Sequence, residues 1–124
     1  MLIGIVGPCG AGKSTLAAGL SALGYEVRCI AQEHSYVPAM WQKITNPGLL
    51  IYLDVSYENT ILRRKLNWTY DEYAQQIYRL RHAREHADYY IDTNTLNILE
   101  VKARVLEYIQ HSSTEHPDEW KKII

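Results

Sequence analysis

The stretch at residues 7–15 constrains the fold of this chain more than any other, and it reads Gly-Pro-Cys-Gly-Ala-Gly-Lys-Ser-Thr. Its spacing is G-x-x-x-x-G-K-[ST], the pattern of a phosphate-binding loop. The apolar run at residues 2–6 predicts a buried parallel strand before the loop. Leucines and alanines at helical spacing follow the loop, and Gly24 stands where a left-handed helix stop is expected. Strand, glycine loop and helix in this order predict a polyphosphate site.

Backbone amides are expected to do much of the binding, because glycines let the chain curl around an anion at a helix N-terminus. Pro8 has no N–H, so we expect the amides of residues 10–14 to donate. Lys13 is expected to reach the β- and γ-phosphates, and the Ser14 hydroxyl to bind Mg²⁺. The predicted nucleotide-binding residues in this stretch are Gly7, Gly10, Ala11, Gly12, Lys13, Ser14 and Thr15.

Length and charge narrow the class of protein. The 124 residues are expected to form one domain. The formal net charge of -1 gives no basic footprint for nucleic acid or for an anionic membrane. No apolar stretch reaches the length of a membrane span, and a strand that begins at residue 2 leaves no room for a signal peptide. We therefore expect a cytoplasmic protein, and the sequence does not indicate its oligomeric state.

Three further strands are predicted. Residues 25–31 alternate between apolar and polar, which is typical of an edge strand, whereas residues 49–53 are continuously apolar and should be central. A short strand is expected at residues 88–92. Helical segments separate these strands, so we predict an α/β fold, a small three-layer sandwich around a parallel four-stranded sheet of order 2-1-3-4.

Capping patterns place the helices. A short helical turn is expected at residues 39–44, and Ser56 is expected to cap a helix that runs to about Leu66. Thr69 with Glu72 forms a capping box for a helix to about His86, and Asn97 with Glu100 forms another for a helix to about Gln110. We predict a domain at residues 1–110 and a C-terminal tail at 111–124.

The loop resembles that of adenylate kinase and its relatives, the nucleoside monophosphate, cytidylate and shikimate kinases. Residues 50–56, followed by Arg63 and Arg64, look like the strand and helix that lead into the lid of these enzymes. Residues 87–93 look like their last strand and the loop beside adenine. Arg81 and Arg84 lie where family members often carry lid arginines that face the phosphates.

The resemblance implies ATP as the nucleotide, Mg²⁺ as its partner ion and a small-molecule acceptor. It implies phosphate contacts from Arg63 and Arg84, and an arginine such as Arg64 stacked on adenine. The chain is a shortened form, since it has one strand fewer than is usual and its lid is reduced to about residues 67–69. The stretch at residues 32–34 stands where relatives place an acidic residue, without their Asp-Gly and following arginine.

Glu33 is the first candidate for the second Mg²⁺ ligand or general base. It follows a strand on the side of the sheet where ligands of parallel folds collect. Asp54 also ends a strand, but it precedes a predicted helix start and can serve in capping. His34, Tyr36 and Trp41 either line an acceptor or base pocket or pack in the core. The predicted catalytic residues are Lys13, Glu33, Arg63 and Arg84, and the predicted metal ligands are Ser14 and Glu33.

We therefore expect an ATP-dependent phosphotransferase that acts on a nucleoside, nucleotide or small alcohol. The alternative is an ATP-binding module, a slow ATPase or a regulator, that has no acceptor site. The short chain favours this alternative, because little sequence remains to hold a second substrate. Neither hypothesis includes nucleic acid or membrane as a partner.

Two patterns suggest other chemistry. Cys9 and Cys29 form no C-x-x-C pair and are expected to be reduced. Cys9 is either a thiol acidified by Lys13 and the helix N-terminus or a small residue that fills a position in the loop. Residues 82–86 match the zinc-peptidase pattern H-x-x-E-H. Because Arg84 and other charges share that helix, we interpret it as a solvated face.

Overall fold

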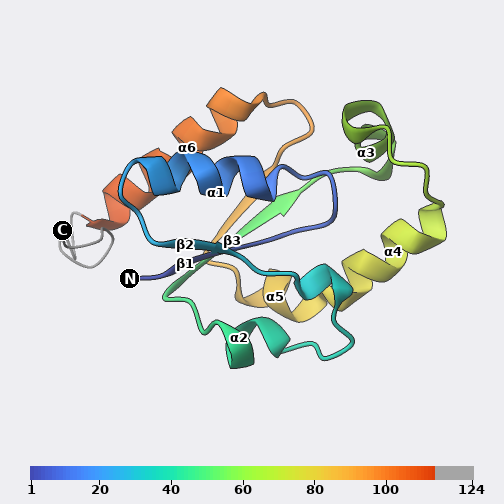
Figure 1. Ribbon diagram of the computed structural model, residues 1–124, viewed down its shortest axis with the longest axis horizontal. Coiled ribbons are helices and arrows are strands. Elements are labelled where there is room, and N and C mark those ends of the chain that lie inside the picture. The colour runs from blue at the N-terminus through green and yellow to red at the C-terminus, as the bar shows by residue number, and fades with distance from the viewer. Residues whose placement is uncertain (114–124) are drawn as a thin grey trace.

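Four parallel strands form the sheet of this protein, whose residues 1–113 are described by a computed structural model (Figure 1). The strand order is β2-β1-β3-β4 and confirms the predicted order. The strands are β1 (Ile3–Val6), β2 (Val27–Cys29), β3 (Leu49–Asp54) and β4 (Tyr89–Asp92). All pairs are parallel, so the carboxyl ends of the strands meet at one edge of the sheet.

The apolar pattern of each strand explains its place in the sheet. β1 is buried throughout and β3 is buried except at Asp54, because helices cover both of their faces. β2 and β4 are the edges, and their side chains are partly exposed. β2 is shorter than the predicted strand at residues 25–31, since only Val27–Cys29 pairs with β1.

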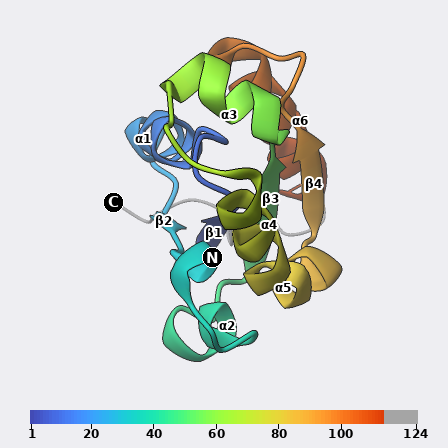
Figure 2. The same cartoon turned by 90° about the vertical axis from the view of Figure 1, so that its right-hand side faces the viewer.

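Helices form the outer layers of the sandwich, as Figure 2 shows end-on. One face is covered by α1 (Lys13–Ala22) and α6 (Ile98–Ser113), whose leucines, valines and isoleucines pack on β1 and β3. The other face is covered by α2 (Met40–Ile44) and α5 (Arg81–His86), through Trp41, Leu80 and Ala83. Within residues 1–113, every helix is too short or too polar to cross a bilayer.

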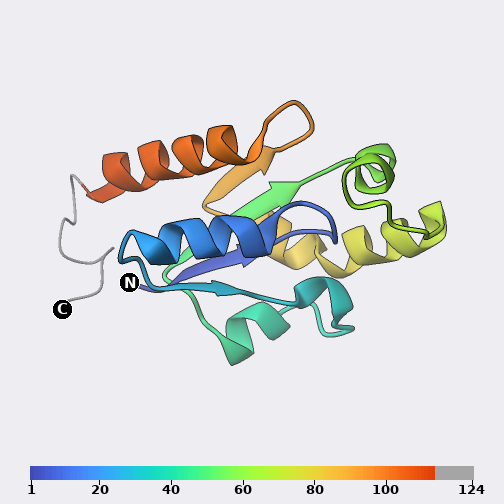
Figure 3. The same cartoon turned by 45° about the horizontal axis from the view of Figure 1, so that its top comes forward.

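The remaining elements lie near the carboxyl edge of the sheet. They are a short 3-10 turn, η1 (Gln32–His34), and the helices α3 (Tyr57–Arg64) and α4 (Tyr70–Arg79). Figure 3 shows α4 extending from α5 beyond the ends of the strands. Helix α4 also contacts η1, although these two elements are far apart in sequence.

The predicted caps are present. The Ser56 hydroxyl accepts a hydrogen bond from the Asn59 amide at the start of α3. Thr69 and Glu72 form a complete capping box at the start of α4. The ring of Trp68, which precedes the helix, packs edge-on against Tyr73. Asn97 and Glu100 exchange the same pair of hydrogen bonds at the start of α6. These local patterns therefore fix where the helices begin.

The ends of three helices differ from the prediction. α3 ends at Arg64 instead of Leu66, because Lys65 takes a left-handed conformation with φ 52°. The helix expected to reach His86 without a break is two helices, separated at the fully buried Leu80. α6 extends to Ser113, three residues beyond Gln110. Residues 114–124 of the predicted tail lie outside the described part of the chain.

Tyrosine hydroxyls stabilise the carboxyl end of β3. Tyr90 donates to the Asp54 carboxylate, and Tyr73 donates to the Val55 carbonyl over 2.7 Å. Burial raises the pKa of both phenols to about 12, and Asp54 contributes to each shift. Tyr52 stacks on Tyr90, and burial, with Asp54 second, raises its pKa as well. These phenols keep their protons at a pH above the ordinary tyrosine pKa, because the ionised forms would be shielded from water and would lie beside a carboxylate.

The first prediction concerns Gly7, whose φ is +155° and whose added Cβ would lie 2.2 Å from the Leu53 carbonyl oxygen. We expect Gly7→Ala to lower the free energy of unfolding by about 3 kcal/mol or more, since backbone must move. Gly24 is the matched control, because it has φ +95° but open space around it. Gly24→Ala should cost only about 1 kcal/mol of left-handed strain. Urea unfolding followed by circular dichroism measures both, and equal losses would contradict the proposed clash.

The second prediction concerns alkaline pH. Tyr73 keeps its proton to about pH 12 in the folded state, whereas an unfolded tyrosine loses it near pH ~10. The folded state therefore binds more protons in this window, and stability should fall as pH rises from ~10 to ~12. Tyr73→Phe should make that fall shallower, as measured by urea unfolding at stepped pH. Tyr78→Phe, at an exposed position, should keep the wild-type slope, and an unchanged slope for Tyr73→Phe would refute the assignment.

Candidate functional site

The glycine loop connects β1 to α1 at the carboxyl edge of the sheet. Gly10 and Gly12 have φ of 90° and 95°, values that L-residues avoid, so the loop depends on glycine there. The Ala11 amide donates to the Pro8 carbonyl within the loop. α1 then begins without a side-chain cap or an acidic residue in its first turn. Its positive end is therefore free of competing protein anions from its own first turn.

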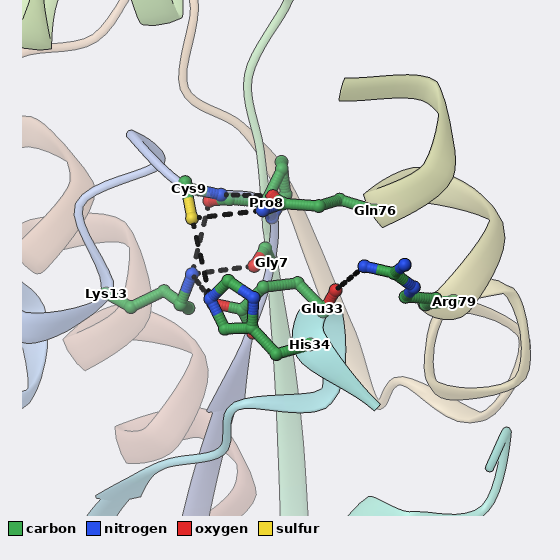
Figure 4. A network of polar contacts seen from close by, with 8 residues as sticks. All are labelled: Gly7, Pro8, Cys9, Lys13, Glu33, His34, Gln76 and Arg79. Carbon is green, nitrogen blue, oxygen red and sulfur yellow. Dashed lines mark hydrogen bonds and ion pairs between the residues drawn. The ribbon is translucent and has the colours of Figure 1, made fainter. Parts of the chain in front are cut away.

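Lys13 and Glu33 form a buried ion pair at this loop. The Lys13 Nζ lies 2.9 Å from Glu33 Oε2, and their side chains are 12% and 6% exposed. The same ammonium donates to the carbonyls of Gly7 and Pro8 over 2.6 and 3.2 Å. Figure 4 shows the lysine reaching across the loop toward Glu33 and His34. Both residues were predicted from the sequence as candidate catalytic residues, and the fold brings their side chains into contact.

One oxygen of Glu33 has no partner. Oε1 is buried and accepts no hydrogen bond, although Oε2 contacts Lys13. A buried carboxylate oxygen without a donor is costly, and such atoms are rare in folded proteins. By contrast, Asp54 has donors on both oxygens, the Val55 amide and the Tyr90 hydroxyl. Glu33 is therefore the carboxylate at this edge with capacity for a cation or a proton.

Gln32 holds the turn that carries Glu33. Its side-chain amide donates to the carbonyls of Val37 and Arg79 over 2.9 and 3.2 Å. Its oxygen accepts from the Trp41 amide over 2.8 Å. Gln32 is almost fully buried, so these three bonds fix η1 against α2 and α4. Gln32 was not predicted as a site residue, because a polar residue in a mixed loop carries no periodic signal.

Helix α4 supplies two polar side chains that were also missed. The Gln76 side-chain oxygen Oε1 accepts from the Cys9 amide over 3.0 Å, and Gln76 Nε2 lies 3.2 Å from Cys9 Sγ. Arg79 donates to the Glu33 carbonyl over 3.4 Å and lies over the Tyr36 ring. Figure 4 shows both side chains reaching toward the loop region from α4. Gln76 shares a helix face with Tyr73 and Leu80, and a glutamine on an apolar face is a signal that was available.

A pocket of about 730 Å³ lies on the other side of the loop. The glycine loop, the start of α1, the end of α3 and the loop before α6 form its walls, which include Thr15, Arg63, Arg64, Leu96 and Leu99. Most of this lining is apolar, as a planar base requires. Arg63 donates to the hydroxyl and the carbonyl of Thr93, which holds its guanidinium at the rim.

The other predicted residues have different surroundings. Arg81 lies over the Tyr78 ring and donates to the Tyr78 carbonyl, and Arg84 lies over the Tyr90 ring. Their predicted approach to phosphates therefore stays a prediction. Trp41 is buried in the core, and its indole donates to His82. The interpretation of Trp41 as core, one of the two that the sequence left open, agrees with this packing.

Ser14 lies beside Cys29 at the start of α1. Burial raises the pKa of the Cys29 thiol, while the charge of Lys13 and a hydrogen bond with Ser14 lower it. Ser14 is exposed, so its hydroxyl is accessible to a ligand at the loop. The predicted roles of Ser14 and Glu33 as metal ligands stay predictions, and the unpartnered Glu33 oxygen fits such a role.

Comparisons with known proteins agree with this geometry. Shikimate kinase from Acinetobacter baumannii, solved in complex with shikimate, has a similar fold with a TM-score of 0.63. The match covers 90% of this chain and 93% of that one at 17% identity, so it shows the fold alone. It confirms the expected likeness to a small P-loop kinase. No curated protein matches the sequence.

The model of a protein family described as an AAA domain matches residues 3–121. This range includes the glycine loop, all four strands and the elements around Glu33. A P-loop domain of this kind binds nucleotide through the backbone of the loop. The chain belongs to this AAA domain family.

Proposed function

We propose that this protein is an ATP-dependent phosphotransferase that acts on a small-molecule hydroxyl or phosphate acceptor. The observation that carries the proposal is the Lys13–Glu33 pair, in which the carboxylate keeps one buried oxygen without a donor. A lysine that binds phosphate and a carboxylate poised to accept a proton are the two charges that phosphoryl transfer requires. They lie together at the glycine loop.

The pocket on the α6 side of the loop supports ATP as the donor. Its apolar walls suit adenine, and Arg64 lines it where a guanidinium can stack on the base. Arg63 lies at the same rim, where it can contact the phosphates. The loop and Thr15 also line this pocket, so base and triphosphate would follow one continuous surface.

Lys13 changes partner in the proposed reaction. In the free protein its ammonium is held by Glu33 and two loop carbonyls. The polyphosphate would draw Lys13 away from Glu33, because phosphate oxygens carry more negative charge. Glu33 is then free to orient the acceptor and to take its hydroxyl proton. The acceptor oxygen bonds to the γ-phosphorus, the bond to the β-γ bridging oxygen breaks, and ADP leaves.

Ser14 is the residue that would hold Mg²⁺ when Glu33 acts as the base, and Glu33, whose unpartnered oxygen fits that ion, is the second ligand in the alternative role. When bound, Mg²⁺ would offset the negative charge of the phosphates. Asp54 suits this role less well, because both of its oxygens already accept hydrogen bonds. Arg84 would need α5 to approach the loop before it could serve as a catalytic cation.

The third prediction tests transfer directly. The protein, ATP and Mg²⁺ are incubated with a panel of nucleosides, nucleotides and small alcohols, and phosphorylated products are identified by mass spectrometry. We expect one acceptor class to gain a phosphate, and Lys13→Ala to abolish ATP binding measured by calorimetry. Lys43→Ala, at an exposed position of α2, is the control and should bind as the wild type does. Tight ATP binding without transfer to any acceptor would favour the binding module or slow ATPase instead.

The fourth prediction separates binding from chemistry at Glu33. Glu33→Gln keeps the shape of the side chain but removes its basicity, so we expect the rate of transfer to fall by about 10²–10⁴-fold. ATP affinity should change far less, because the loop amides and Lys13 remain. Glu85→Gln, at an exposed position of α5, is the matched control and should keep full activity. A Glu33→Gln variant with normal turnover would exclude this carboxylate as the base.

A further inference from the structure

Cys9, Glu33 and His34 form a cluster of metal-ligand atoms that the proposed reaction does not explain. Their Sγ, carboxylate oxygen and ring nitrogen all lie within 4.8 Å of one another. Cys9 comes from the glycine loop, and the other two come from η1, as Figure 4 shows. Among residues 1–113 it is the one group of this kind that the geometry brings together.

The unpartnered oxygen of Glu33 is an independent indication of a ligand. The Glu33 side chain is 6% exposed, and its Oε1 has no hydrogen-bond donor. His34 contributes a ring nitrogen 3.9 Å from the other oxygen, Oε2. A cation between these side chains would satisfy a charge that the protein alone leaves incompletely paired.

The distances fit a tetrahedral ion. Cys9 Sγ and His34 Nε2 are 3.9 Å apart, and His34 Nε2 and Glu33 Oε2 are also 3.9 Å apart. Zinc bonds of ~2.0–2.3 Å place neighbouring ligand atoms about 3.3–3.6 Å apart. His34 Nε2 would need to approach each of these two atoms by about half an ångström, and Cys9 Sγ lies within 4.8 Å of the Glu33 carboxylate. The His34 side chain is 61% exposed and can make that adjustment by rotating.

We propose that Cys9, Glu33 and His34 form a binding site for a thiophilic divalent cation of the Zn²⁺ type. A thiolate, an imidazole and a carboxylate together suit zinc, whereas Mg²⁺ prefers oxygen ligands alone. The thiol proton passes to solvent as the metal–sulfur bond forms, and water takes the fourth position. The site is separate in ligand chemistry from the Mg²⁺ site of the proposed reaction, although the two share Glu33.

Lys13 competes with the metal for Glu33. Its ammonium already lies 2.9 Å from Oε2, so a cation in the cluster must displace or tolerate this charge. Gln76 acts differently, because its Nε2 lies near Cys9 Sγ and helps to fix the thiol on the α4 side. Removal of the lysine charge should therefore strengthen metal binding, an effect that a nonspecific surface site would not show.

The experiment is a titration of the full chain with Co²⁺, a spectroscopic substitute for Zn²⁺, under a non-thiol reductant. We expect a sulfur-to-cobalt charge-transfer band and the visible bands of tetrahedral cobalt, both lost on addition of Zn²⁺. Cys9→Ser should remove the charge-transfer band, and His34→Gln should weaken binding by at least about tenfold. Lys13→Ala should tighten Co²⁺ binding by about tenfold, although the same variant loses ATP binding. Cys29→Ser and His86→Gln are matched controls and should titrate as the wild type does.

Several results would overturn the site. These are a cobalt spectrum without sulfur character, a Cys9→Ser variant with an unchanged spectrum, and displacement of Co²⁺ by about a hundredfold excess of Mg²⁺. Weaker Co²⁺ binding in Lys13→Ala would exclude competition at Glu33. The titration contains no nucleotide, so its result and that of the transfer assay are independent.

Discussion

The ion pair between Lys13 and Glu33 joins the loop after β1 to the turn after β2, and the site depends on it. Burying two charges costs several kcal/mol of desolvation per ion, which their attraction offsets only when the remaining polar atoms are satisfied. Here one Glu33 oxygen is not satisfied. A contribution to the stability of the folded state therefore does not explain why this ion pair is buried. It is well explained by a site whose charges exchange partners when a ligand binds.

The parallel sheet explains why these charges meet. β1 pairs with both β2 and β3 in the same direction, so the segments after Val6, Cys29 and Asp54 leave the sheet side by side. The glycine loop follows β1, and η1 follows β2. Gln32 then holds η1 against α2 and α4, and Gln76 on α4 accepts a hydrogen bond from the Cys9 amide of the loop. A site made of segments distant in sequence becomes rigid through these buried side-chain amides and the register of two strands.

Local patterns in the sequence predicted the sheet order, the glycine loop and the helix caps, because each depends on residues a few positions apart. Lys13 and Glu33 were predicted as separate candidates, Lys13 from the spacing of the glycine loop and Glu33 because it follows a strand. The contacts from α4 were not, because Gln76 and Arg79 lie 67 and 46 residues along the chain from the residues that they contact. Arg84 lies over the Tyr90 ring, a placement that spacing alone does not give.

Sequence spacing also fails to predict the candidate metal ligands, which fall into two groups, His82 with His86 and Cys9 with Glu33 and His34. The spacing of His82 and His86 matches a zinc motif, yet His82 Nδ1 accepts from the Trp41 indole and His86 Nδ1 contacts the His82 carbonyl. Within residues 1–113, the two rings do not gather with a third ligand residue into a compact group. Cys9 and His34 match no motif, because 25 residues separate them. A cysteine in a phosphate loop gains a histidine neighbour only when β2 pairs with β1 and η1 turns back toward the loop. Metal ligation at this loop is therefore a property of the topology, and a search by sequence spacing would find His82 and His86 instead of Cys9 and His34.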